Sequence, residues 1–226
     1  MIRAGRILVG LALLAFAAPD AEAQVAEHQF QIIAYGGWHI YAGGSGLEGG
    51  PSLGGDATYY ILPSVGIGLN MDLTFSEVDG SKFPLASLNW VDSTTLHIVN
   101  QPVDVWTYGA HVKLQLPERR IAPYALLGAG GYTLFLDPQQ NDQVATENGF
   151  MVKLGLGADF AFSERLGINL SVTDNFFPNW DPNVLFPVTE QNQNTIFPDL
   201  NPDPSELDDS VHNLRFVAGV TIVPGG

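Results

Sequence analysis

The feature that most constrains this chain is the alternation of large apolar residues with small or polar ones over stretches of about ten residues. Successive side chains of a β-strand point to opposite faces, so this period predicts strands with one apolar and one polar face. From Val65 to Phe75 the odd positions are all apolar, and the even positions are Gly, Asn, Asp or Thr. Strands predicted in this way cover residues 30–40, 53–61, 65–76, 106–116, 121–136, 150–162, 166–172 and 214–222.

The connections between these segments alternate between short and long. Short connections, at 62–64, 117–120 and 163–165, are rich in the residues that tight hairpins use. Long connections span 39–52, 78–103, 137–149 and 175–210. Short periplasmic turns and long extracellular loops are typical of outer-membrane proteins. The sequence therefore predicts an all-β fold, an eight-stranded antiparallel up-and-down transmembrane β-barrel.

A soluble barrel of lipocalin type is the alternative, because it has the same period but buries its apolar face. Its outer face would be hydrated and normally rich in Lys and Glu. Here the polar positions are mostly Gly, Asn, Ser and Thr, which suits a crowded lumen. Mean hydropathy is +0.11, and only 15% of the residues are charged. These values favour the membrane barrel.

The first residues resemble an export signal. Arg3 and Arg6 precede an apolar run from 7 to 18, and Ala21-Glu22-Ala23 has the small-x-small pattern of a cleavage site. The alternative is a membrane anchor, but the run is shorter than the roughly 20 residues that a spanning helix needs. We expect a cleavable signal peptide over residues 1–23, a barrel domain over 24–226 and an outer-membrane location.

Composition excludes several kinds of chemistry. The chain has no cysteine, so it has no disulfide, thiol nucleophile, CxxC zinc site or lipidated cysteine. Its 24 acidic and 9 basic residues make nucleic acid an unsuitable partner. Its five histidines lack metal-ligand spacing, and Gly44-Ser45-Gly46 lacks the second glycine of a GxSxG elbow. We expect no catalytic residue, no metal, no cofactor and no enzymatic activity.

Aromatic residues on the apolar face lie near both ends of the predicted strands. Aliphatic residues fill the stretch between them, which predicts two girdles around a lipid-facing band. The predicted girdle consists of Trp38, Tyr59, Phe75, Trp106, Tyr108, Phe150, Phe160 and Phe162.

Charged residues on the polar face form a predicted lumen network. Counted from the short turns, one group contains Asp72, Lys153 and Arg215, and a group closer to the turns contains Asp56, Asp159, His111 and Lys113. Buried charges must be paired, because an unpaired one costs several kcal/mol. We therefore expect a lumen plugged by ion pairs and hydrogen bonds; the alternative is a gated solute path in which the pairs rearrange.

Three stretches, 122–132, 155–168 and 212–222, give the chain a resemblance to the OmpA/OmpX/OmpW-like outer-membrane β-barrel domain group. This resemblance implies contact with outer-membrane lipid and lipopolysaccharide, and with periplasmic chaperones and the barrel-assembly machinery during biogenesis. It also implies an alternative function, an OmpW-like passage or binding site for small apolar solutes through a gated narrow lumen. The inward positions Tyr35, Tyr60 and Met151 are candidates to line that path.

The long loops are candidates for recognition. They carry most of the acidic residues, including a cluster from Asp199 to Asp209, which are either solvated charges or oxygen ligands for Ca²⁺. The last loop contains Phe176, Phe177, Trp180, Phe186 and Phe197, which either form a recognition surface or fold back as a lid. Our leading hypothesis is a non-enzymatic membrane scaffold whose loops contact or adhere to an extracellular ligand.

Overall fold

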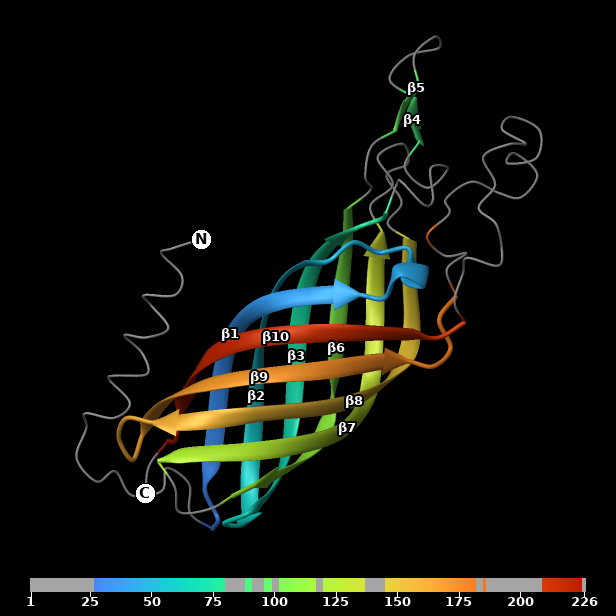
Figure 1. Ribbon diagram of the computed structural model, residues 1–226. Helices are drawn as coiled ribbons and strands as arrows, with labels where there is room; N and C mark the ends of the chain where they lie inside the picture. The colour runs from blue at the N-terminus through green and yellow to red at the C-terminus, as the bar shows by residue number, and fades with distance from the viewer. Residues whose placement is uncertain are drawn as a thin grey trace.

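The described part of the computed structural model comprises residues 27–79, 88–90, 96–98, 102–116, 120–136, 145–181, 185 and 209–224. Eight antiparallel strands form a closed barrel in the order β1-β10-β9-β8-β7-β6-β3-β2 (Figure 1). Each strand pairs with its neighbours along the chain, and β1 pairs with β10 to close the barrel. The barrel strands are β1 (Phe30–Tyr41), β2 (Gly50–Leu62), β3 (Val65–Glu77), β6 (Pro102–Gln115), β7 (Ile121–Leu136), β8 (Ala145–Ala161), β9 (Leu166–Phe177) and β10 (Val211–Ile222).

The apolar face of every barrel strand points outward. Leu69 is 67% exposed, Val112 and Leu154 are also exposed, and Ile168 is half-buried on the same outer face. In β3 the small and polar positions between Val65 and Glu77 are buried instead. This arrangement is the reverse of a soluble barrel, which buries its apolar face. The prediction of an inside-polar, outside-apolar barrel is confirmed.

The strands extend further toward the long loops than the alternation predicted. β9 continues from the predicted end at 172 to Phe177, and β6 begins at Pro102 instead of 106. In a closed barrel each strand has a partner on both sides, so backbone pairing continues past the point where the side-chain pattern weakens. Two short strands within the predicted loop 78–103, β4 (Leu88–Trp90) and β5 (Leu96–Ile98), pair with each other and were not predicted.

The connection from β1 to β2 contains one turn of 3-10 helix, η1 (Gly43–Ser45). Within the described ranges, no helix is long and apolar enough to cross a lipid bilayer. The predicted signal peptide at 1–23 lies outside the described residues.

Candidate functional site

The lumen is the candidate functional site, and glycines on the inward face make room for its large side chains. A Cβ atom at Gly68 of β3 would lie 2.5 Å from the ring of His111 on β6. A Cβ atom at Gly157 of β8 would lie 2.4 Å from the ring of Tyr124 on β7. Both distances are shorter than any real contact. The glycines that alternate with apolar residues therefore leave the space that rings and charged groups fill in the lumen.

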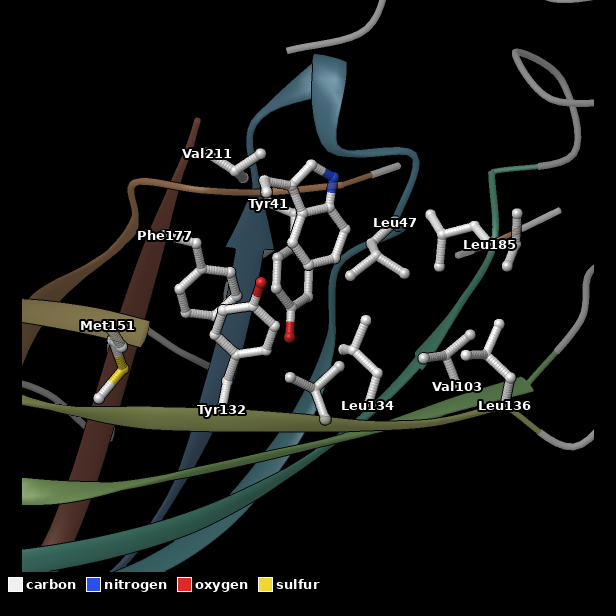
Figure 2. Close-up of a cluster of buried hydrophobic side chains, with 13 residues drawn as sticks. Tyr41, Leu47, Val103, Tyr132, Leu134, Leu136, Met151, Phe177, Leu185 and Val211 are labelled. Carbon is white, nitrogen blue, oxygen red and sulfur yellow. The ribbon is translucent and has the colours of Figure 1, made fainter. Parts of the chain in front are cut away.

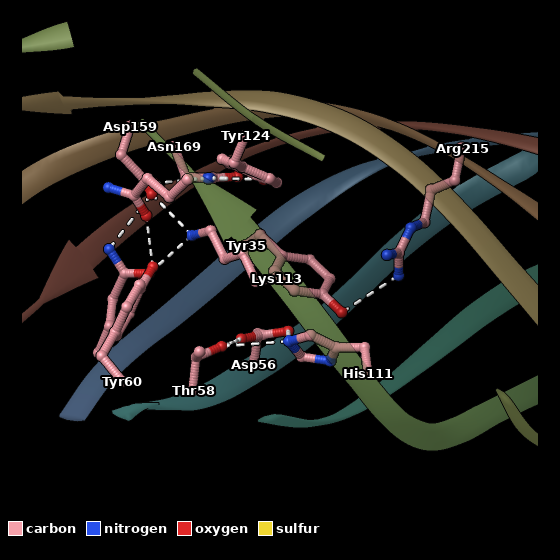
Figure 3. Close-up of polar contacts among 12 residues, drawn as sticks. Tyr35, Asp56, Thr58, Tyr60, His111, Lys113, Tyr124, Asp159, Asn169 and Arg215 are labelled. Carbon is pink, nitrogen blue, oxygen red and sulfur yellow. Dashed lines mark hydrogen bonds and ion pairs between the residues drawn. The ribbon is translucent and has the colours of Figure 1, made fainter. Parts of the chain in front are cut away.

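The end of the lumen nearest the short turns contains a buried ion pair between Lys113 and Asp159 (Figure 3). The Lys113 Nζ atom lies 2.7 Å from Asp159 Oδ2 and also donates a hydrogen bond of 2.7 Å to Gln31 Oε1. The Asn169 amide donates to Asp159 Oδ1 at 2.7 Å and to the Tyr124 hydroxyl at 2.9 Å. The ammonium also lies 4.0 Å from the centre of the Tyr124 ring. Five strands are thus held together by one pair of opposite charges and its hydrogen bonds.

A second contact in the lumen joins Asp56 of β2 to His111 of β6. The His111 Nε2 atom lies 3.3 Å from Asp56 Oδ2, and the Thr58 hydroxyl donates to Asp56 Oδ1 at 2.7 Å. The sequence placed these two residues in one group with Lys113 and Asp159. The structure divides that group into two separate contacts, because the register between strands, and not the distance from the turn, decides which side chains meet.

A third buried contact, closer to the long loops, joins Arg215 of β10 to Asp72 of β3 across the lumen. Arg215 also donates to the hydroxyl of Thr173 and to that of Tyr35, each at 3.1 Å. Thr107 donates to Asp72 Oδ2 at 2.7 Å. The planar guanidinium is well suited to this position, since its several fixed donors can satisfy three partners at once.

Lys153 differs from the other predicted lumen charges. Its side chain is buried, yet among the described residues it makes no ion pair and no hydrogen bond. It lines a small internal cavity of about 20 Å³, together with Asp56 and Arg215. That volume is enough for roughly one water molecule. The expectation that every inward charge is paired therefore fails at Lys153, although this residue does face the lumen.

The mouth of the lumen at the long-loop end is closed by an apolar cluster (Figure 2). Trp180, just beyond β9, folds back over the mouth, and its indole N–H donates to the Ser45 carbonyl at 3.0 Å. The Tyr132 ring stacks on Phe177 with centroids 4.1 Å apart. The cluster consists of Tyr41, Leu47, Val78, Val103, Val105, Tyr132, Leu134, Leu136, Met151, Phe177, Trp180, Leu185 and Val211.

This cluster decides part of the question about the last loop. Phe177 and Trp180 are buried as a lid, whereas Phe176 is half-buried and its ring lies against His212. Phe186 and Phe197 lie outside the described residues. Sequence reasoning did not predict the cluster itself. Its signal was the apolar residues at inward positions near the loop ends of two strands, as at 103 and 105 in β6 and at 134 and 136 in β7.

The three positions suggested to line a solute path do not lie in one site. Tyr35 faces the small internal cavity and Met151 belongs to the apolar cluster at the mouth. Tyr60 lies near the short turns, where its hydroxyl bonds to the Gln115 side chain and lies 3.2 Å from Gln31 Oε1. Each of the three side chains packs in a different part of the interior, so they do not line one path together.

The combination of an apolar exterior, a closed barrel and a polar lumen points to a protein of the bacterial outer membrane. The family model described as outer membrane protein beta-barrel domain matches residues 8–185. The chain belongs to this family. It is therefore an outer-membrane β-barrel protein that contacts membrane lipid.

Two solved structures illustrate how this outer-membrane barrel compares with others. Neisserial surface protein A is 12% identical, with 85% of this chain and 96% of that chain covered and a TM-score of 0.54. OprG from Pseudomonas aeruginosa is 11% identical, with 90% and 99% covered and a TM-score of 0.52. At such low identity these likenesses show the fold alone. No curated protein sequence matches the chain.

The predicted girdle residues all lie on the outward face of this outer-membrane barrel. Five are exposed, namely Trp38, Phe75, Tyr108, Phe150 and Phe162. The other three, Tyr59, Trp106 and Phe160, are half-buried. Their contact with the two membrane interfaces stays a prediction.

Possible metal ligands, including the acidic residues of the loops, are the last group of candidate site residues. Among the described residues, no group of three or more His, Cys, Asp or Glu side chains could hold a metal ion. Most of the acidic loop residues considered for Ca²⁺, including Asp199 and Asp203, lie outside those residues.

Proposed function

We propose that this protein is a non-enzymatic, closed barrel that serves as a scaffold in the outer membrane and presents its long loops at the cell surface for contact or adhesion. The observation that carries this proposal is the filled lumen. Its side chains form the Lys113–Asp159 and Asp72–Arg215 ion pairs, and an apolar cluster covers the mouth. A barrel of this width normally fills its interior with side chains.

The distribution of charge supports a role for the loops. After residue 23 the chain has seven basic residues, of which three lie in the lumen and three in the predicted short turns at 119, 120 and 165. The predicted long loops therefore contain a single basic residue, Lys82, and most of the acidic ones. An acidic surface favours contact with a basic partner or with one that binds through divalent cations, and opposes contact with bare lipopolysaccharide phosphates.

The buried position of the lumen histidines also supports the proposal. The two histidines of the lumen, His39 and His111, contact Thr74 and Asp56 respectively. Each histidine lies within hydrogen-bond distance of a threonine hydroxyl, Thr74 for His39 and Thr58 for His111, but both pairs are buried in the lumen, where a substrate would have to displace packed side chains to reach them. We extend the proposal to biogenesis, with a cleavable signal peptide over 1–23, periplasmic chaperones and the barrel-assembly machinery, and to girdles that hold the barrel in lipid and lipopolysaccharide.

Planar-bilayer recording tests the closed lumen. The refolded protein is expected to give no steady conductance at neutral pH, whereas steady open-channel current would overturn the proposal.

A second measurement tests the loops: cells that display the full protein are compared with cells that display a variant lacking residues 186–208. Adhesion to host-cell or matrix surfaces should fall on removal of this segment. Heat-modifiable gels serve as the control that both cell lines carry equal amounts of folded barrel. Unchanged adhesion would show that this loop does not mediate the contact.

One observation favours a second candidate, passage or binding of small apolar solutes. The loop end of the lumen is lined by apolar side chains, such as Val105, Leu134 and Met151. A solute that entered there would next meet the Asp72–Arg215 pair, which would have to separate. Uptake of a small apolar solute into vesicles containing the barrel, above that into empty vesicles, would favour this candidate over the closed scaffold.

A further inference from the structure

The outer wall formed by β1, β10, β9 and β8 carries a groove on its lipid-facing side. These four strands lie side by side in Figure 1, and the groove between them has a volume of about 800 Å³. Its floor lies where Gly36 of β1 faces Ala218 of β10 in register. Trp38 and Phe216, the next outward pair toward the long loops, also line it, as does Leu170 of β9.

A polar pair adjoins the groove on its long-loop side. The Nδ1 atom of His212 lies 2.7 Å from Asp174 Oδ2, and Asp174 Oδ1 accepts the backbone N–H of Asn213 at 3.2 Å. The imidazole also lies against the Phe176 ring, with centroids 4.6 Å apart. Asp174 faces Leu214 in register, and Leu214 is the next outward residue after those that line the groove on β10. Asp174 is the next outward residue after Val172, which lines the groove on β9, so the imidazole is held in place two outward positions beyond Phe216.

The orientation of His212 leaves one ring nitrogen for a ligand. Since Nδ1 donates its proton to Asp174, Nε2 is an acceptor in the neutral ring and a second donor in the protonated ring. Nε2 has no partner among the described residues, and the side chain is exposed. Charged groups on the lipid face of a barrel are costly except near the membrane interface, which places this pair at the level of the lipid headgroups.

We propose that this groove binds one outer-leaflet glycolipid of the lipopolysaccharide type. One acyl chain lies along the groove over Gly36 and Ala218, and a hydroxyl oxygen of the sugar head hydrogen-bonds to Nε2 of His212. The long-loop side of the barrel faces the outer leaflet, where such lipids are found. A second copy of the chain fits less well, because twelve described residues line the groove, whereas a stable protein interface uses roughly 20–30 residues a side.

Native mass spectrometry of the folded barrel tests this proposal, with lipid A and dioleoylphosphatidylethanolamine as the two probes. Ala218→Leu places a larger outward side chain in the groove, and His212→Phe keeps an aromatic ring beside Phe176 but removes both ring nitrogens. Ala110→Leu is the matched control, because Ala110 is an exposed outward alanine of β6, away from the groove. Heat-modifiable gel migration shows that each variant is folded.

Wild type and Ala110→Leu are expected to retain one lipid A per barrel with equal affinity. Ala218→Leu should raise the Kd by about tenfold or more, equivalent to about 1.4 kcal/mol, and His212→Phe should raise it for lipid A but not for phosphatidylethanolamine. Equal retention by all four proteins would overturn the site. A Kd for phosphatidylethanolamine as low as that for lipid A would overturn the assignment of the sugar head. A wild-type dimer that Ala218→Leu separates would overturn lipid in favour of a second copy.

Discussion

The two ends of the lumen are closed by different interactions. Toward the short turns the interior is a hydrogen-bonded network around Lys113 and Asp159, in which most polar groups have partners. Toward the long loops it is an apolar cluster around Tyr132, Phe177 and Trp180. Both ends are buried to a similar degree, but the first is specific in its geometry and the second depends mainly on the removal of apolar surface from water.

This difference follows from what surrounds the barrel at each level. Within the bilayer the exterior is already apolar, so apolar residues gain nothing by turning inward and the lumen is left with polar groups that must satisfy one another. Near the loops the barrel emerges into water, and burial of aromatic and aliphatic side chains becomes favourable again, as it is in a soluble protein. The barrel therefore has a polar core at the level of the bilayer and an apolar core near the long loops.

The largest expected effect comes from breaking the polar end. Asp159→Ala removes the carboxylate that contacts Lys113, Gln31 and Asn169, and leaves a buried ammonium without its counter-charge. We expect the free energy of unfolding to fall by about 3–5 kcal/mol, measured by urea unfolding of the vesicle-refolded barrel. The double variant Asp159→Leu/Lys113→Met should lose less than Asp159→Ala alone. Equal losses of unfolding free energy in the two variants would show that the unpaired ammonium of Lys113 is not what destabilises Asp159→Ala.

The apolar end should respond more locally. Trp180→Ala removes the ring that packs on Tyr132 and Phe177 and donates to Ser45. We expect the lid to open at a cost of about 3 kcal/mol in apolar burial, with faster proteolysis near 178–185 and little change in global unfolding. Trp38→Ala is the control, since that tryptophan faces outward. Proteolysis at the wild-type rate would show that Trp180 does not hold the lid.

The smallest effect should have the opposite sign. Among the described residues Lys153 is buried without an ion pair, and it shares its cavity with the cation Arg215 as well as with Asp56. Lys153→Met keeps the length of the side chain but removes the desolvated charge, so the free energy of unfolding should rise by about 1 kcal/mol. The same urea titration measures it. A loss of stability would show that Lys153 has a stabilising partner in the folded barrel.

The sequence alone predicted the fold better than it predicted the contacts. Alternation placed Leu69 outside and Asn70 inside because a strand has only two faces. It could not predict that Asp56 meets His111 while Asp159 meets Lys113, since strand tilt and stagger in a barrel shift the heights of neighbouring strands. The mouth cluster was missed for a related reason: Val103 and Leu134 were treated as loop or strand-end residues, although they occupy inward positions.

The groove and the polar pair beside it could not be predicted at all. They depend on Gly36 and Ala218 being neighbours in register, and on His212 and Asp174 meeting across β9 and β10. These residues are far apart in the sequence, and none belongs to a motif.

The most direct test of a sealed, inside-polar barrel uses the absence of native cysteine. Leu69→Cys and Asn70→Cys place a thiol on the outer and inner face of the same strand, and each variant is refolded into lipid vesicles. We predict that neither thiol reacts with a water-soluble reagent, and that only the thiol at 69 reacts with a lipid-soluble maleimide. Rapid reaction at position 70 with the water-soluble reagent would show an open aqueous lumen and contradict the account.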